Sequence, residues 1–178
     1  MKSTLQSVLT VGLLLLLLSG CSVRYGEQSP VLPIDSSWVL LPVINLAEAP
    51  LAGEKVEAML GNALRLRGIK SLAHPVAPAE TGVLLLDDRQ RFESVLKKVK
   101  QGDAQYGITG TVNEWRYKVG LDGEPSVGLT LQVIELPSQN VLWSVSGART
   151  GWGYASVSGT AEKLIDELLQ NLTLQKQD

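Results

Sequence analysis

Apolar and polar residues alternate with two different periods along the chain. In the first half, apolar residues recur every three or four positions after Pro50 and again after Asp88, which is the spacing of amphipathic helices. From Tyr106 onward the period becomes two, as in strands with one buried face. Helical spacing returns over Leu164–Leu172. The chain is therefore expected to combine helices and strands in one fold.

The order of these elements predicts the architecture. An unbroken apolar run, Trp38–Val43, is expected to form a buried first strand. A helix that ends at Gly68, a short strand over Ile69–Leu72 and a second helix follow. Turn sequences separate the next three strands, 106–112, 127–133 and 141–145, so they should form an antiparallel meander. The order β-α-β-α-β-β-β-α predicts an α/β fold in which helices cover one face of a mixed five-stranded sheet.

The first 20 residues have the layout of a bacterial secretory signal. Lys2 gives a positive start, and the apolar stretch Val8–Leu18 is shorter than the roughly 20 residues that span a bilayer. The sequence Leu18-Ser19-Gly20-Cys21 matches the lipobox, in which the cysteine becomes the first mature residue and carries lipid. Since Cys21 is the only cysteine, lipidation accounts for it better than a disulfide.

The pattern divides the chain into a lipoprotein signal peptide (1–20), a lipid-anchored tether (21–36) and a single α/β domain (37–175). Glycine, proline and serine are frequent from Ser22 to Ser37, which indicates a flexible or extended segment. Fully extended, it would span about 55 Å. The domain is therefore expected to stay close to its membrane, and Ser22 in place of Asp after the cysteine favours the outer membrane.

Charge and chemistry narrow the function further. Removal of residues 1–20 changes the net charge from −2 to −3. The mature chain therefore lacks the excess of basic residues that would indicate nucleic-acid binding. His74 is the only histidine and lies in a proline-rich loop, which leaves little for a metal cluster or a serine–histidine triad. Helix capping explains Asp87 and Asp88 better than paired catalytic carboxylates. We predict no catalytic residue, metal or cofactor, although a glycan hydrolase with dispersed acids stays open.

Two features suggest a surface function. Trp152 lies between two glycines and is expected either to project from the surface, where Trp and Tyr favour membrane interfaces, or to cap the edge of the core. Asp122 and Glu124 lie at a predicted hairpin tip. An ordinary turn is the simpler interpretation, but carboxylates repeated around a ring would make a strongly negative opening.

Three segments resemble one known family. Trp38–Val43, Trp115–Pro125 and Trp143–Trp152, followed by a C-terminal helix, are similar to PelC, the outer-membrane lipoprotein of the Pel exopolysaccharide export machinery. The resemblance extends from about Ser37 to Leu172. It implies a fold like the N-terminal domain of TolB, and a twelve-membered ring beneath the porin PelB on the periplasmic side of the outer membrane.

The resemblance also implies roles for individual residues. The negative inner surface of the ring would guide a cationic, partly deacetylated amino-sugar polymer to the porin during biofilm matrix secretion. Cys21 would be the lipid site, and Trp152 would face the membrane with Arg149 as a neighbouring family position. The family's lumen acids cannot be transferred residue by residue, so Asp122 and Glu124 are candidates from the hairpin composition alone.

An alternative of another class is a monomeric accessory lipoprotein that binds and regulates another envelope protein, such as a cell-wall synthase. The oligomeric state separates the two hypotheses. The short tether favours a ring that lies against its membrane.

Overall fold

The computed structural model describes residues 22–26, 28–75, 88–119 and 123–176. The predicted signal peptide, Cys21, Asp87 and Asp122 lie outside these ranges. The strands are β1 (Ser22–Gly26), β2 (Leu32–Pro33), β3 (Trp38–Asn45), β4 (Leu72–Ala73), β5 (Tyr106–Tyr117), β6 (Pro125–Glu135), β7 (Val141–Thr150) and β8 (Leu174–Gln175). The helices are α2 (Ala52–Leu66), α3 (Asp88–Val99) and α4 (Val157–Leu169).

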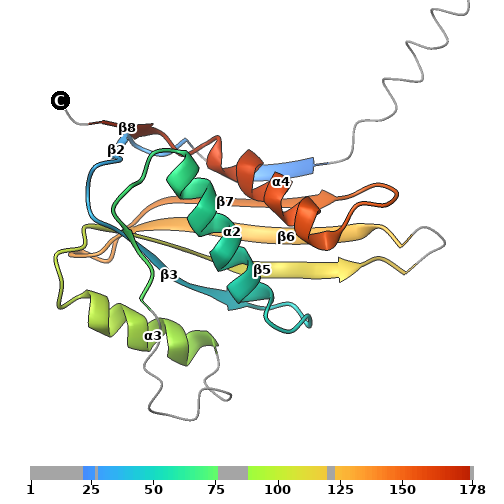
Figure 1. The fold of residues 1–178 in the computed structure, drawn as a ribbon, viewed down its shortest axis with the longest axis horizontal. Helices are drawn as coiled ribbons and strands as arrows, with labels where there is room; N and C mark the ends of the chain where they lie inside the picture. Colours follow the sequence, from blue (N-terminus) through green and yellow to red (C-terminus); the bar gives the residue numbers. More distant parts are fainter. Residues whose placement is uncertain (1–21, 27, 76–87, 120–122, 177–178) are drawn as a thin grey trace, which may run out of the picture.

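The fold is a mixed sheet with helices packed on it (Figure 1). The sheet has six strands in the order β1-β7-β6-β5-β3-β4, and β2 pairs with β8 in a separate two-stranded ribbon. Strand β3 runs parallel to both of its neighbours, whereas β5, β6, β7 and β1 form an antiparallel series. The predicted α/β class and the element order from β3 to α4 are confirmed.

The main core lies between the sheet and the pair α2 and α4, which cross one of its faces (Figure 1). Alternate residues of β6 face this core because side chains alternate across a strand: Val127, Leu129, Leu131 and Val133 are all fully buried. The helices supply leucines at helical spacing, as predicted, including Leu60 and Leu64 from α2 and Leu164 and Leu168 from α4.

Helix α3 packs on the opposite face of the sheet, which differs from the expected placement of all helices on one face. Its Val95 and Val99 pack against Val39 and Leu41 of β3. The reason is the apolar run at the start of β3, where consecutive residues point to alternate faces and both faces need cover. A continuous apolar strand therefore indicates helices on both sides.

Part of the segment predicted to be a flexible or extended tether is hydrogen-bonded to the domain. Strand β1 adds to the edge of β7, which gives the sheet its sixth strand. The Ser29 hydroxyl accepts a bond from the Thr173 backbone N–H at 2.6 Å, and Leu32 N–H donates to the Thr173 carbonyl at 2.9 Å. Pairing through the backbone requires no periodic side chains, so the sequence pattern did not show it.

Within the part of the chain that the structure covers, no helix combines the length and apolar character needed to cross a bilayer.

Candidate functional site

Several segments meet at one end of the sheet, at the right of Figure 1. The pairing of Tyr117 with Pro125 closes the β5–β6 hairpin there, and Ser126 pairs with Thr150 at the end of β7. The first residue of β1, Ser22, pairs with Arg149 of β7. Ser22, the residue after the predicted lipid site, thus lies against the end of β7 at Arg149, three residues before Trp152.

This end of the molecule exposes large apolar side chains. Tyr117 is 55% exposed, Val119 107%, Trp152 76% and Tyr154 110%. We call these four residues the apolar end. Large exposed apolar side chains that gather at one place are typical of an interaction surface, and Trp and Tyr suit the boundary between lipid and water.

The two glycines that flank Trp152 hold it outward. Gly151 N–H donates to the Pro125 carbonyl at 2.8 Å, which fixes the turn to the hairpin. A Cβ on Gly151 would lie 2.5 Å from Pro125 Cγ, so a larger residue does not fit without a shift. Gly153 has φ +58°, a left-handed conformation that glycine adopts readily. The expectation that Trp152 projects from the surface therefore agrees with its exposure, and capping of the core does not.

Arg149 has a different environment from Trp152. Its guanidinium forms an ion pair with Glu167 of α4, and its side chain is only 22% exposed. Arg24 of β1 donates to the Glu167 carbonyl at 3.0 Å. These contacts hold α4 against β7 and β1 within one subunit. Contact of either Arg149 or Trp152 with a membrane stays a prediction.

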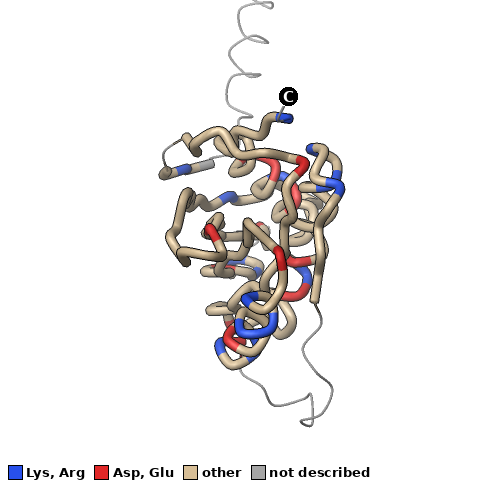
Figure 2. The backbone as a smooth tube through the Cα atoms, turned by 90° about the vertical axis from the view of Figure 1, so that its left-hand side faces the viewer, with Lys and Arg blue, Asp and Glu red and all other residues tan. Residues whose placement is uncertain are grey.

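The hairpin that carries the candidate acids contains charges of both signs. Glu124 is half-buried, and its carbonyl accepts from Lys118 N–H at 2.7 Å. The Lys118 ammonium donates to the Thr150 hydroxyl at 3.0 Å. Viewed from the opposite end, acidic and basic positions are interspersed along the backbone rather than gathered by sign (Figure 2). A lumen role for Asp122 and Glu124 stays a prediction that depends on repetition in an assembly.

Glu114 is an acid on the same hairpin with a perturbed pKa. Partial burial raises the pKa of its carboxyl, but hydrogen bonds from Arg116 and Ser126 and the positive charges of Arg116 and Lys118 outweigh burial. The pKa therefore lies below its ordinary value of 4.5. The bonds measure 2.7 Å from Arg116 Nε and 2.8 Å from Ser126 Oγ.

A buried polar cluster was not predicted from the sequence. Glu57 of α2 is 3% exposed, and its carboxylate accepts from Val43 N–H at 2.8 Å and forms an ion pair with Arg91 of α3. His74 Nε2 lies 3.2 Å from Glu57 Oε2, so His74 is bonded to the domain rather than fully solvated as expected. One signal was present: Glu57 precedes Leu60 and Leu64 at the spacing of the buried face of α2.

The same cluster covers the outer edge of β3. Asp88 accepts from Asn45 N–H at 2.8 Å, a role that differs from the predicted helix cap. Arg91 donates to the Val43 carbonyl at 3.5 Å. Together with Glu57, these side chains bond the backbone groups that β3 turns away from β5. We call Glu57, Asp88 and Arg91 the edge cluster.

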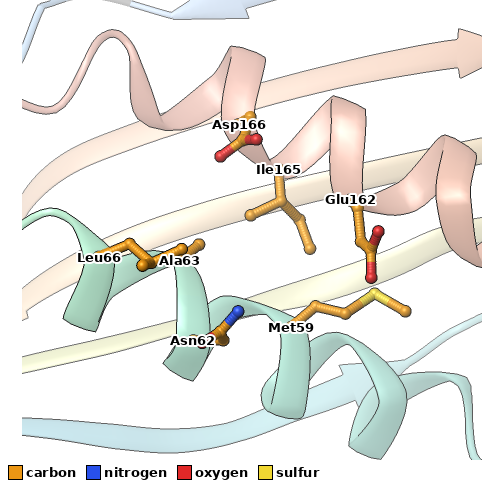
Figure 3. Close-up of a pocket in the computed structure, with 7 residues that line it drawn as sticks. All are labelled: Met59, Asn62, Ala63, Leu66, Glu162, Ile165 and Asp166. Carbon is orange, nitrogen blue, oxygen red and sulfur yellow. The ribbon is translucent and has the colours of Figure 1, made fainter.

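A shallow groove of about 200 Å³ lies between α2 and α4. Figure 3 shows Met59, Asn62 and Leu66 of α2 facing Glu162, Ile165 and Asp166 of α4. Asp166 forms an ion pair with Arg67 at 3.1 Å, which links the two helices. Among the residues described, no three His, Cys, Asp or Glu side chains gather in a way that could hold a metal.

Comparison with known proteins decides the family. No protein-family model matches the chain, and no curated protein does either. Among solved structures, the PelC dodecamer from Paraburkholderia phytofirmans aligns with a TM-score of 0.73 and 31% identity, over 88% of this chain and 100% of that chain. The chain belongs to the PelC family.

A second PelC structure supports this assignment, and a more distant lipoprotein shares the fold. A substituted PelC dodecamer from the same organism aligns with 30% identity and a TM-score of 0.70, over 85% of this chain and 97% of that one. The lipoprotein GNA1162 from Neisseria meningitidis is 16% identical, with a TM-score of 0.59 over 76% of this chain and 96% of that one, and it shares the fold. The resemblance of the sequence to PelC is thereby confirmed.

Proposed function

We propose that this PelC-family protein is a non-enzymatic outer-membrane lipoprotein that assembles into a ring. The ring guides a cationic exopolysaccharide (Pel) to the export porin PelB during biofilm matrix secretion. The observation that carries the proposal is the alignment at 31% identity with a PelC dodecamer over the whole length of that chain.

The position of β1 supports a membrane-facing apolar end. In the proposed organisation, residues 1–20 are a signal peptide and Cys21 carries the lipid at the periplasmic face of the outer membrane. Ser22 pairs with Arg149, so the lipid attachment point on Cys21 would be close to the exposed side chains of Trp152 and Tyr154. Aromatic side chains at the headgroup level and acyl chains in the bilayer would then act at one surface.

The role of the acids follows from repetition. One subunit carries a small net charge, −2 for the full sequence, so a strong field cannot come from one copy. Asp122 and Glu124 at the hairpin tip would recur around a ring and give a negative opening. Weak, repeated attraction suits transport of an amine-bearing polymer, because tight binding would stall it.

Polymer secretion tests the guiding role. Asp122→Asn combined with Glu124→Gln should reduce secreted polymer severalfold and leave the amount of assembled protein unchanged. The matched control is Asp103→Asn, an exposed acid before β5, which should secrete normally. Full secretion by the hairpin variant would contradict a guiding role for these two acids.

A further inference from the structure

At the apolar end the sheet has two open edges. Strand β3 ends at Asn45, whereas β5 continues to Tyr117, so within the described chain β5 has only β6 as a strand partner from Asn113 onward. On the other side, among the residues that the structure describes, β1 has β7 as its one strand partner. The backbone N–H and C=O groups along such edges can pair with a strand of another molecule.

Along the outer edge of β3, side chains form hydrogen bonds with the backbone groups that could otherwise pair with another strand. The outer edge of β3 bonds to the edge cluster: Glu57 and Asp88 accept from the N–H groups of Val43 and Asn45, and Arg91 donates to a carbonyl. Natural sheets cover or blunt edges that should not pair. The fold therefore blocks pairing at β3 and leaves it possible at β1 and at the end of β5.

The two open edges run in opposite directions, and the start of β1 is level with the open end of β5. Val23 of β1 pairs with Ala148, Ala148 with Gly128, and Gly128 with Glu114 of β5. Each step in this series is antiparallel, so β1 is antiparallel to β5. Without a shift along the strands, Arg24–Gly26 would lie opposite residues 110–112, which β3 already pairs. A displacement of about two residues toward Tyr117 lets β1 of one copy meet residues 113–117 of the next in antiparallel orientation, with Val23 opposite Arg116.

The surfaces beside these edges suit each other. A groove of about 450 Å³ lies along the open edge of β5, between Leu46–Glu48 and Asn113–Arg116. Leu46 is 62% exposed in this groove, and β1 exposes Val23 by 49% and Tyr25 by 74%. An incoming strand would bury apolar area on both sides and fill the groove.

We propose that the subunits of the ring join by strand addition, with β1 of one copy pairing with residues 113–117 of the next. The occupant of the β5 groove is a second copy of this chain. Such an interface is heterologous, since two different surfaces meet, and heterologous interfaces are the kind that close into rings. Backbone pairing would supply affinity, as in other cases of strand addition. This inference rests on the proposed ring and assigns its interface.

Disulfide trapping tests the interface in the chain 22–178, which lacks cysteine because Cys21 is the only one. Val23→Cys is combined with Glu114→Cys in one variant and with Arg116→Cys in another. Glu114 and Arg116 are two residues apart on one strand, hence on the same face, so a small register shift is still detected. The control combines Val23→Cys with Ser138→Cys, in the exposed β6–β7 turn at the other end of the sheet.

After oxidation, at least one test pair should give a ladder of covalent multimers on a denaturing gel, which a reductant removes, and the control should not. In parallel, Val23→Lys with Tyr25→Lys should lower the solution mass to that of one subunit with an unchanged circular dichroism spectrum. An assembly of full mass that gives no ladder and tolerates both lysines would overturn this interface and leave the ring. A monomer at every concentration would overturn the ring itself.

Discussion

The outer edge of β3 and the apolar end are two parts of the same sheet with opposite distributions of charged and aromatic side chains. At the edge of β3, charged side chains from α2 and α3 turn inward and bond the backbone, and Glu57 is almost fully buried. At the apolar end, aromatic side chains turn outward and Trp152 is 76% exposed. Charged side chains are usually exposed and large aromatic side chains are usually buried, and these two regions show the opposite arrangement. We expect the buried charges at the edge of β3 to govern stability and the exposed aromatic side chains to govern function.

The largest effect on stability should come from Glu57→Ala. This substitution leaves the Arg91 charge without its buried partner and Val43 N–H without its acceptor, and removal of one partner from a buried pair costs about 3 kcal/mol or more. Urea unfolding measures the loss. Asp166→Ala breaks an ion pair in which the Asp166 side chain is 64% exposed, and it should cost less than about 1 kcal/mol. Equal stability of the two variants would refute a stabilising role for the edge cluster.

Gly151→Ala should have the next largest effect. The added Cβ would lie 2.5 Å from Pro125 Cγ and 2.6 Å from Thr160 Oγ1, so the Trp152 turn must shift away from the hairpin and α4. Overpacking of this kind costs about 1–3 kcal/mol. Thermal unfolding should show a lower Tm, together with a changed environment of Trp152 in its fluorescence. A Tm equal to that of the parent would show that the turn is looser than its contacts indicate.

Glu114 should make a smaller contribution that depends on pH. Because its pKa is lowered in the folded protein, its stabilising effect is present above the pKa of the unfolded chain and is lost as pH falls through the folded value. Glu114→Gln should therefore destabilise the protein at pH 7 and lose less stability than the parent between about pH 5 and pH 3. Urea midpoints at both ends of this range measure the difference. Parallel pH profiles for parent and variant would contradict the assignment.

Trp152→Ala should have the smallest effect on stability and a clear effect on function. Its side chain is largely exposed, so the free energy of unfolding should change by less than about 0.5 kcal/mol. Binding of the domain to lipid vesicles, and polymer secretion in cells, should both fall. Leu66→Ala on α2 is a matched control, since Leu66 is 79% exposed and lies on α2, outside the apolar end. Full secretion by the Trp152 variant would refute its membrane role.

Most of the fold could be predicted from the sequence because the spacing of apolar residues distinguishes its main helices from its strands. The alternation in β5, β6 and β7 and the helical spacing in α2 and α4 correspond to elements that bury one face each. Two features were not predictable in this way. Strand β1 pairs through its backbone, which leaves no mark in side-chain type, and the face that α3 covers depends on the twofold burial of β3.

The candidate site was predictable only where a local signal existed. Glycines on both sides of Trp152 indicated its exposure, because they fit a turn with little room and a positive φ. The edge cluster was not predicted because its members come from separate segments: Glu57 lies on α2, whereas Asp88 and Arg91 lie on α3. His74, which contacts Glu57, follows β4. Only the fold brings them together, although the position of Glu57 on the buried face of α2 was visible in the sequence.

The most direct test of the ring is the solution mass of residues 22–178, measured by light scattering at two salt concentrations. The account predicts a closed assembly of defined mass, near twelve subunits by analogy with the PelC dodecamer, at both salt concentrations. A monomer under both conditions, and also in the presence of lipid vesicles, would contradict the ring and favour an accessory lipoprotein that acts on another envelope protein.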